Sequence, residues 1–458
     1  MVESLKLALA APDLRRRIFF TIFILVIYRA AANIPVPGVD LEQWIRFTDQ
    51  SALGGDQLLS FLNLLSGGAV GRFSVMAMGV YPYITASIII QLLTPIVPQL
   101  TEWSQEGESG RNRINRLTYY MTVPLALLQA IGQIRLIGLS IGVPGTDGLS
   151  LIMPNFGMEP GQILPTLMTL IAMTGGTMFA IWLGELITED GIGQGISLII
   201  FGGIVAGIFP GIASLLGLPD VTAQVFGIVA FLIITVLTIV VIVIVHEGQR
   251  RIPVQYGRRV RGRKVYQGQS SFVPLKVNTA GMIPIIFANS ILIFPPLLAG
   301  IFVDNSGSVV DTVAKAIAGF GQQDPAQLGF YFYWLFFFLL VVGFTYFYTD
   351  VMVRQQNIPQ TLQRQGGFIP GIRPGKRTER YIMSVVRRIT FAGAMFLGTI
   401  AILPGIMQLL GYILNIQGLQ QSALVVSGSG MIIVVGVVID TMRQLESQLL
   451  MRQYEGMF

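Results

Sequence analysis

The sequence has no cysteine, a single histidine, His246, and few charges: only 12% of its 458 residues are charged. Without cysteine the chain forms no disulfide and no thiolate metal site, and it offers no thiol nucleophile. One histidine at the end of a long apolar run excludes a multi-histidine metal site and leaves every serine without a general base. We therefore expect a protein that is not an enzyme and that holds no metal and no cofactor.

A phosphate-binding loop is also missing. The nearest string, residues 370–377 (Pro-Gly-Ile-Arg-Pro-Gly-Lys-Arg), lacks the first glycine and the final hydroxyl of the Gly-x-x-x-x-Gly-Lys-Ser/Thr motif. If the protein does directional work, a partner or a gradient must supply the energy.

Apolar residues make up 53% of the chain and gather in long runs. A soluble domain carries about 25% charged residues, and a spanning helix needs about 20 mostly apolar residues. The sequence thus predicts an all-α polytopic membrane protein. We place ten transmembrane helices at residues 18–35, 75–97, 117–136, 165–184, 195–213, 223–246, 278–302, 328–349, 389–409 and 424–440.

Lysine and arginine mark one side of the membrane. If the N-terminus is cytoplasmic, the cytoplasmic segments hold 25 of the 30 basic residues, and the positive-inside rule favours that orientation. The charges are densest in two connections, residues 247–277 and 350–388. Both termini then face the cytoplasm. The expected location is the plasma (inner) membrane, with a thylakoid membrane as the alternative if the host is a cyanobacterium or a plastid.

The ten spans divide at a short connection, residues 215–222, into an N-terminal half, residues 1–214, and a C-terminal half, residues 223–458. An odd number of spans in each half forces the halves into opposite orientations. Inverted-repeat membrane proteins have this arrangement, and their pathway lies between the halves near the midplane. We expect a hinge at 215–222 and a central pore, although no repeat is visible at the level of single residues.

Residues 60–74 are apolar but too short to cross a bilayer. A stretch of 10–14 apolar residues is more often re-entrant or interfacial. Gly67 and Gly68 permit a bend, because glycine has no Cβ to restrict its backbone. Two interpretations stay open: an amphipathic helix on the outer surface, or a movable plug folded into a cavity.

Ionisable side chains are rare inside the predicted spans, and Arg29 is the clearest exception. Ion-coupled transporters usually keep such groups in the middle of the membrane. A secondary transporter built on a five-plus-five inverted repeat remains the alternative function, and this scarcity counts against it.

Several strings resemble the SecY family of protein-conducting channels, and they occur in family order along the chain. They are Arg29 with residues 34–38, then residues 86–94, 106–111, 182–185, 191–201, 249–256, 275–284 and 366–375. Asp190 and Gln194 stand where the family often has Arg and Asn, which puts in doubt a partner contact made there.

The resemblance implies the pore-forming subunit of a channel that translocates unfolded preproteins and releases transmembrane segments sideways into lipid. Its pore ring would consist of Val80, Ile84, Ile196, Ile200, Ile283, Ile286 and Ile433. Such a ring is apolar and stiff, so it can gate by dewetting. Taken one at a time, these residues are typical of ordinary helix packing.

The same resemblance implies two further elements. The plug would include Phe61, Leu64, Leu65, Gly67, Gly68 and Arg72, and a lateral gate between spans 2–3 and 7–8 would include Thr85, Gln129 and Asn278. Polar contacts between membrane helices average under about 1 kcal/mol, so a seam held by them can open.

The two basic connections would dock the SecA motor ATPase or the ribosome. The residues implied are Arg250, Arg251, Arg258, Arg259, Arg261, Arg373, Lys376 and Arg377. Ribosomal RNA offers phosphates to such residues, and anionic lipids attract the same charges. SecE and SecG are the implied small subunits, and preproteins with signal sequences are the implied cargo.

Overall fold

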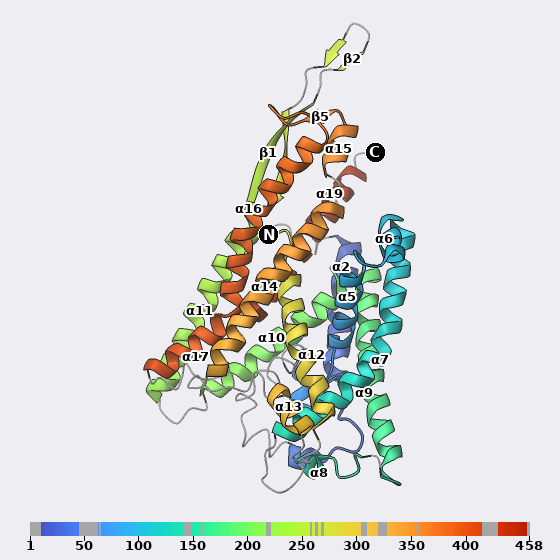
Figure 1. The fold of residues 1–458 in the computed structure, drawn as a ribbon, viewed down its shortest axis with the longest axis vertical. Helices are drawn as coiled ribbons and strands as arrows, with labels where there is room; N and C mark the ends of the chain where they lie inside the picture. Colours follow the sequence, from blue (N-terminus) through green and yellow to red (C-terminus); the bar gives the residue numbers. More distant parts are fainter. Residues whose placement is uncertain are drawn as a thin grey trace.

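The computed structural model describes residues 11–44, 63, 66–140, 148–157, 159–216, 221–256, 259–261, 264–266, 270–303, 309–318, 328–355, 358–414 and 429–455. The fold is mostly helical, as predicted (Figure 1). Its longer helices are α2 (Pro12–Ala31), α5 (Tyr81–Leu93), α7 (Glu108–Ser140), α9 (Ile163–Asp190), α10 (Gly195–Leu216), α11 (Val221–Glu247), α12 (Ile283–Ile301), α14 (Leu328–Gln355), α16 (Lys376–Ala401) and α19 (Ser429–Glu455).

Shorter elements join these helices. They are η2 (Val70–Arg72), α6 (Pro98–Gln105), α8 (Gly148–Ile152), α13 (Val309–Ala318), α15 (Ile358–Arg364) and α17 (Leu403–Leu414). Proline stands in the first turn of α5 and of α12, where its missing N–H is not needed by the helix.

Each of the ten predicted ranges overlaps one long helix. By length and composition alone, six helices of the described residues can cross a membrane, or seven if the bent pair α5 and α6 counts as one span. The chain is thus a helical membrane protein with several apolar spans.

Two of the predicted spans are interrupted in the structure. The range 75–97 was expected to be one helix, but α5 starts only at Tyr81, and the chain turns by 100° between α5 and α6. The range 389–409 is divided between α16 and α17, and α16 already begins at Lys376. Apolar character continues through both breaks, so hydropathy does not reveal them.

A small antiparallel sheet is present in addition to the predicted helices. Strands β1 (Gln249–Tyr256) and β4 (Ser270–Lys276) form a hairpin, and β5 (Gly367–Phe368) pairs with the far end of β1. Strands β2 (Arg259–Arg261) and β3 (Lys264–Tyr266) form a second pair. An all-α protein was expected, and the sheet was missed because its strands lie in short, charged connections.

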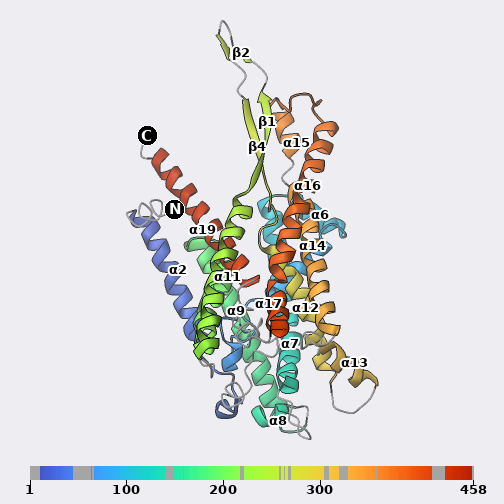
Figure 2. The same cartoon turned by 90° about the vertical axis from the view of Figure 1, so that its left-hand side faces the viewer.

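The molecule has two distinct ends. The hairpin, α6, α15, the start of α2 and the last turns of α19 lie toward one end, here called the hairpin end (Figures 1 and 2). Helices α8 and α13 lie toward the opposite end. Every described connection rich in lysine and arginine lies at the hairpin end.

One large hydrophobic cluster joins the early helices to the late ones. Helix α12 packs against α5 and α7, and α10 packs against α11 and α19. The predicted boundary at 215–222 falls between α10 and α11, and residues 217–220 of that hinge lie outside the described residues.

Candidate functional site

The predicted ring residues come from four helices that meet in the large cluster. Val80 is the N-cap residue of α5 and Ile84 lies in its first turn, Ile196 and Ile200 belong to α10, Ile283 and Ile286 to α12, and Ile433 to α19. Five of the seven are buried members of the cluster, while Ile196 and Ile283 are partly buried and pack against it. These seven residues, here called the aliphatic centre, thus come from both halves of the sequence and all belong to, or pack against, one large hydrophobic cluster.

The segment 66–74 is folded into the molecule rather than lying on its surface. Ala69, Val70 and Phe73 are buried members of the large cluster, whereas Arg72 is exposed. Gly67 has φ +70°, and a Cβ built on it would lie 3.0 Å from the Cα of Gly203 in α10. The surface-helix interpretation is therefore wrong for these residues. Phe61, Leu64 and Leu65 of the predicted plug lie outside the described residues.

Hydrogen bonds anchor this segment to α2 and to the chain that follows α2. Tyr28 donates its hydroxyl to Ser66 O at 3.3 Å, and the indole of Trp44 donates to Gly71 O at 2.9 Å. The N–H of Val36 donates to Phe73 O at 2.9 Å. Sequence reasoning missed Tyr28 and Trp44, because nothing in their local pattern indicates a partner so far along the chain.

The predicted gate residues Thr85 and Gln129 contact each other. The amide Nε2 of Gln129 in α7 donates to Thr85 Oγ1 in α5 at 3.2 Å, and both side chains are buried. Both residues precede the hinge, so their bond does not cross between the halves. Asn278, also buried, donates only locally, to Gly281 O at 3.1 Å.

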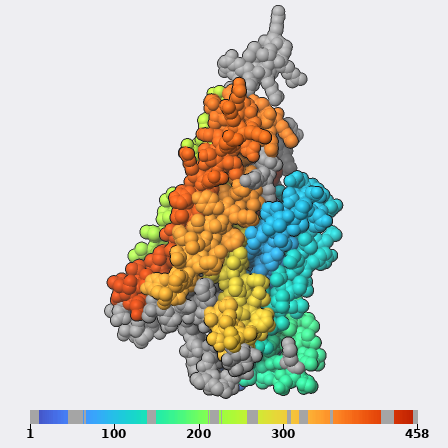
Figure 3. Space-filling model, in the orientation of Figure 1, coloured from blue at the N-terminus to red at the C-terminus, as the bar shows by residue number. Residues whose placement is uncertain are grey.

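At the seam between α5 and α7 on one side and α12 on the other, the contacts come from residues that the sequence did not single out. The Tyr81 hydroxyl donates to Ser290 O of α12 at 2.9 Å. A Cβ added at Gly132 in α7 would lie 2.1 Å from Leu297 O in α12, so the two helices touch through backbone. Figure 3 shows this seam from outside, where the yellow α12 and orange α14 meet the blue and cyan α5 and α7.

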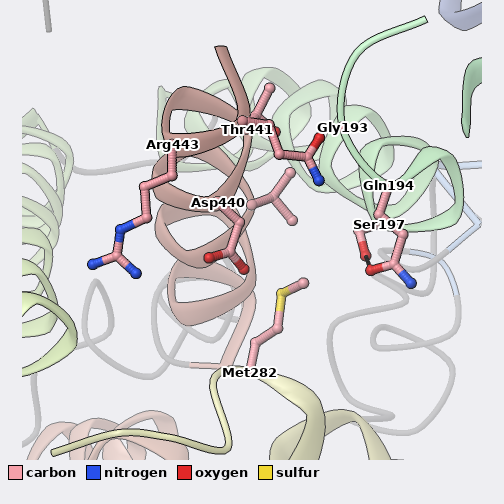
Figure 4. A pocket seen from close by; sticks show the side chains of 9 residues that line it. Gly193, Gln194, Ser197, Met282, Asp440, Thr441 and Arg443 are labelled. Atoms are coloured by element: carbon pink, nitrogen blue, oxygen red, sulfur yellow. Dashed lines mark hydrogen bonds between the residues drawn. The ribbon is translucent and has the colours of Figure 1, made fainter. Parts of the chain in front are cut away.

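A cavity of about 290 Å³ opens between α10, α19 and the start of α12 (Figure 4). Polar side chains predominate in its lining, which consists of Gly193, Gln194, Ser197, Met282, Val437, Asp440, Thr441, Arg443 and Gln444. The Ser197 hydroxyl donates to Gln194 Oε1 at 3.0 Å. A polar mouth of this kind can hold water and hydrated peptide groups.

Helix α10 fixes the order of these features. Ser197 lines the cavity, Ile200 belongs to the aliphatic centre, and Gly203 touches the buried segment. These residues are three apart, so they follow one another at about 4.5 Å along the axis. Cavity, aliphatic centre and buried segment therefore lie in line from the hairpin end inward.

The two basic connections form one platform. Strand β5, from the second connection, pairs with β1, from the first, through Gln255–Phe368 and Tyr256–Gly367. A separate small hydrophobic cluster lies beneath them, made of Ile252, Val254, Leu275, Val353, Leu362, Ile369, Ile382 and Val386. The connections 247–277 and 350–388, expected as loops, are thus largely ordered strand and helix.

Seven of the eight predicted docking residues lie in the described part of these two connections. Arg250, Arg251, Arg373, Lys376 and Arg377 are exposed. The Arg251 guanidinium lies 4.8 Å from the centre of the Phe272 ring, which orients it on the hairpin. Arg259 and Arg261 belong to β2, and Arg258 lies outside the described residues.

Among the residues that the structure describes, no three histidine, aspartate or glutamate side chains gather as metal ligands would. Apolar helices packed around one hydrophobic cluster, a cavity with polar side chains beside it and a segment folded among the helices are the features of a membrane channel.

The comparisons with known proteins agree with this class. Residues 74–442 match the family model for SecY. The chain is 42% identical to the protein translocase subunit SecY of Halalkalibacterium halodurans, over 97% of this chain and 96% of that protein. It is 41% identical to the subunit of the same name from Thermus thermophilus, over 100% and 97% of the two chains.

Solved structures share the fold. One described as a protein conducting channel superposes with a TM-score of 0.58 at 17% identity, covering 94% of this chain and 92% of its own. Sec61 in the canine ribosome-channel complex gives a TM-score of 0.57 at 16% identity, with the same coverage. The chain belongs to the SecY family. It is a subunit of a protein-conducting channel, and not an enzyme.

Proposed function

We propose that the chain spans the membrane ten times in two inverted halves, residues 1–214 and 223–458, joined by the hinge at 215–222. The ten long helices alternate in direction between the two ends of the molecule, which supports this count. The basic residues gather at the hairpin end, so that end and both termini face the cytoplasm. The host membrane is the plasma membrane or, in a photosynthetic host, the thylakoid.

The pathway for an unfolded preprotein runs from the polar cavity through the ring of Val80, Ile84, Ile196, Ile200, Ile283, Ile286 and Ile433. The observation that carries this proposal is the order along α10 of cavity, aliphatic centre and buried segment. β-Branched aliphatic side chains form no hydrogen bonds with a passing chain and exclude water from a narrow opening. Segment 60–74 is the plug that completes the seal.

Membrane segments leave sideways through the seam between α5 and α7 on one side and α12 and α14 on the other. Tyr81–Ser290 is the one hydrogen bond described between α5 and α12. Thr85, Gln129 and Asn278 line this gate. Since a single polar contact in a membrane is worth about 1 kcal/mol, a hydrophobic signal sequence can compete with the closed seam.

The platform is the docking surface for the SecA motor ATPase and the ribosome. Its exposed arginines suit the phosphates of RNA and the carboxylates of an acidic groove. SecE and SecG are the proposed small partner subunits, and anionic lipids would bind near the same charges. A small-solute transporter is not favoured, because the centre between the halves is aliphatic and offers no cluster of charged ligands within the described residues.

Reconstitution tests the function directly. The chain would be placed in proteoliposomes with its small subunits, and a preprotein with a signal sequence would be added with SecA and ATP. We expect protease-protected preprotein to accumulate only when the signal, SecA and ATP are all present. Accumulation without a signal, or none in the complete mixture, would contradict the proposal.

The plug can be tested by ion leakage. Replacing Gly67 with alanine should raise the resting ion conductance several-fold, because the new Cβ meets Gly203 at 3.0 Å and the backbone has φ +70°. Deleting residues 60–70 should raise the conductance further. Conductance is read in planar bilayers that contain the purified complex.

Gly38 provides the matched control for this substitution. It also has positive φ, +90°, but no atom lies within 4 Å of an added Cβ. Gly38→Ala introduces the same backbone strain without displacing the segment, so its conductance should stay at the original level. Equal ion conductance in the two alanine variants, or no increase in conductance after the deletion, would show that segment 60–74 is not a plug.

A further inference from the structure

A group of charged side chains joins the base of the hairpin to the pore-mouth helix α19. The guanidinium Nη2 of Arg443 donates to Glu247 Oε1 at 2.7 Å. Beside this pair, His246 Nε2 lies 3.9 Å from Asp440 Oδ1, a distance at which a protonated imidazole forms an ion pair. Both contacts bridge α11 and α19, which pack against each other.

The α11 side of these contacts belongs to the hairpin. His246 and Glu247 are the last residues of α11, and β1 begins two residues later at Gln249. The N–H of Val277, just after β4, donates to Gly248 O at 2.8 Å and closes the base of the hairpin there. A short, hydrogen-bonded stretch of chain therefore connects the hairpin to Glu247, so that a displacement of the hairpin would also displace Glu247.

Lys276, at the end of β4, lies within the electrostatic reach of the same group. Partial desolvation and the positive charge of Arg443 lower the pKa of its ammonium group, while Asp440 and Glu247 act in the opposite direction. Lys276 therefore interacts electrostatically with charged residues of both α11 and α19.

The α19 side of these contacts belongs to the pore mouth. Asp440 and Arg443 both line the cavity, together with Gln194 and Ser197 of α10 and Met282 at the start of α12. In Figure 4 the Arg443 side chain extends away from α10, whereas Gln194 and Ser197 lie across the cavity from α19. The pair with Glu247 therefore holds the guanidinium at the side of the mouth.

Arg443 has a second acceptor within reach on its own helix. Asp440 precedes it by three residues, and residues three apart on a helix face the same side. If Glu247 moves with the hairpin, the guanidinium can turn toward Asp440 and compete with His246 for that carboxylate. The structure shows the arrangement with the hairpin base bound to α19, and release of the base would leave Arg443 the carboxylate of Asp440 on its own helix.

We propose that the Glu247–Arg443 ion pair is a latch that positions the hairpin base against the pore mouth, and that docking of a partner on the hairpin releases it. The inference rests on the proposed function and adds a route from the platform to the pore. The side chains are partly exposed, 33% for Arg443 and 52% for Glu247. Such pairs are weak enough to break when a partner binds.

The test uses the complete complex in proteoliposomes and two precursors, one with an intact signal and one with a shortened apolar core. Glu247→Gln and Arg443→Gln should each raise transport of the weak-signal precursor by up to about fivefold, the range that a partly exposed pair supports. The double variant Glu247→Arg with Arg443→Glu restores the pair with its charges exchanged. It should bring transport back toward the original level.

Arg113→Gln is the matched control, because it removes another exposed ion pair, with Glu106 at 3.4 Å, that involves neither α11 nor α19. It should leave the ratio between the two precursors unchanged. Unchanged ratios in both single variants, or an exchanged variant no better than the singles, would overturn the latch. If the original complex transports neither precursor, the proposed function itself fails, and the two failures are thereby distinguished.

Discussion

Replacing Arg373 with glutamate is expected to reduce SecA-driven export by roughly thirtyfold or more, because a charge reversal at a docking site costs about 2 kcal/mol or more. Arg373 is exposed, and its carbonyl accepts a hydrogen bond from the buried Thr378 at 3.0 Å. The backbone at Arg373 is thus fixed while its side chain is free to meet a partner. The rate of ATP-dependent preprotein protection in proteoliposomes measures the effect.

The variant should still fold, since no packing contact is lost at an exposed position. Arg113→Glu serves as the control: it carries the same charge change on α7, where Arg113 is exposed and pairs with Glu106 at 3.4 Å. This control should export at nearly the original rate. Export by Arg373→Glu at the same rate as by Arg113→Glu would remove the motor-docking role from Arg373.

Replacing Ile84 with asparagine is expected to let preproteins with weak signals through the channel. Ile84 is only 6% exposed and belongs to the large hydrophobic cluster. A buried amide without a partner costs about 1–3 kcal/mol, and it allows water into a closure that depends on being dry. Ile286→Asn should act in the same way from α12. Export of a precursor with a shortened signal, relative to an intact one, measures the loss of selectivity.

The Ile187→Asn variant in α9 is the control that distinguishes a loss of signal selectivity from a general loss of stability. Ile187 is fully buried in the same cluster, on a helix that contributes no residue to the predicted ring. Its substitution should lower the unfolding temperature by a similar amount and leave the ratio between weak and intact signals unaltered. If the three asparagine variants relax selectivity equally, the ring assignment is wrong and general loosening explains the effect.

Some of the site could be found from sequence because it depends on residues close together in the chain. The pair Gly67 and Gly68 suggested a bend in a short apolar stretch, and both have positive φ in the structure. Thr85 and Gln129 were grouped through a family resemblance, and their side chains do meet. The residues that these four contact could not be inferred from the sequence.

Other features escaped the sequence because their partners are distant along it. The hydroxyl of Tyr81 binds a carbonyl 209 residues away, and Arg443 binds Glu247 across 196 residues. Strands β1 and β5 lie in two separate basic connections, and nothing in the sequence indicated that they pair with each other. A local pattern carries no information on which distant group will satisfy a donor.

The sequence alone was sufficient for the membrane class, the side on which positive charge gathers, and the family. These follow from composition and short strings, since transfer into lipid depends on the local run of side chains. The tertiary structure decided that the predicted ring residues share one hydrophobic cluster, that segment 66–74 is buried beside α10, and that the two basic connections pair through β1 and β5. The reason is that buried helices are apolar on several faces, so their pattern does not indicate which face meets which neighbour until packing selects it.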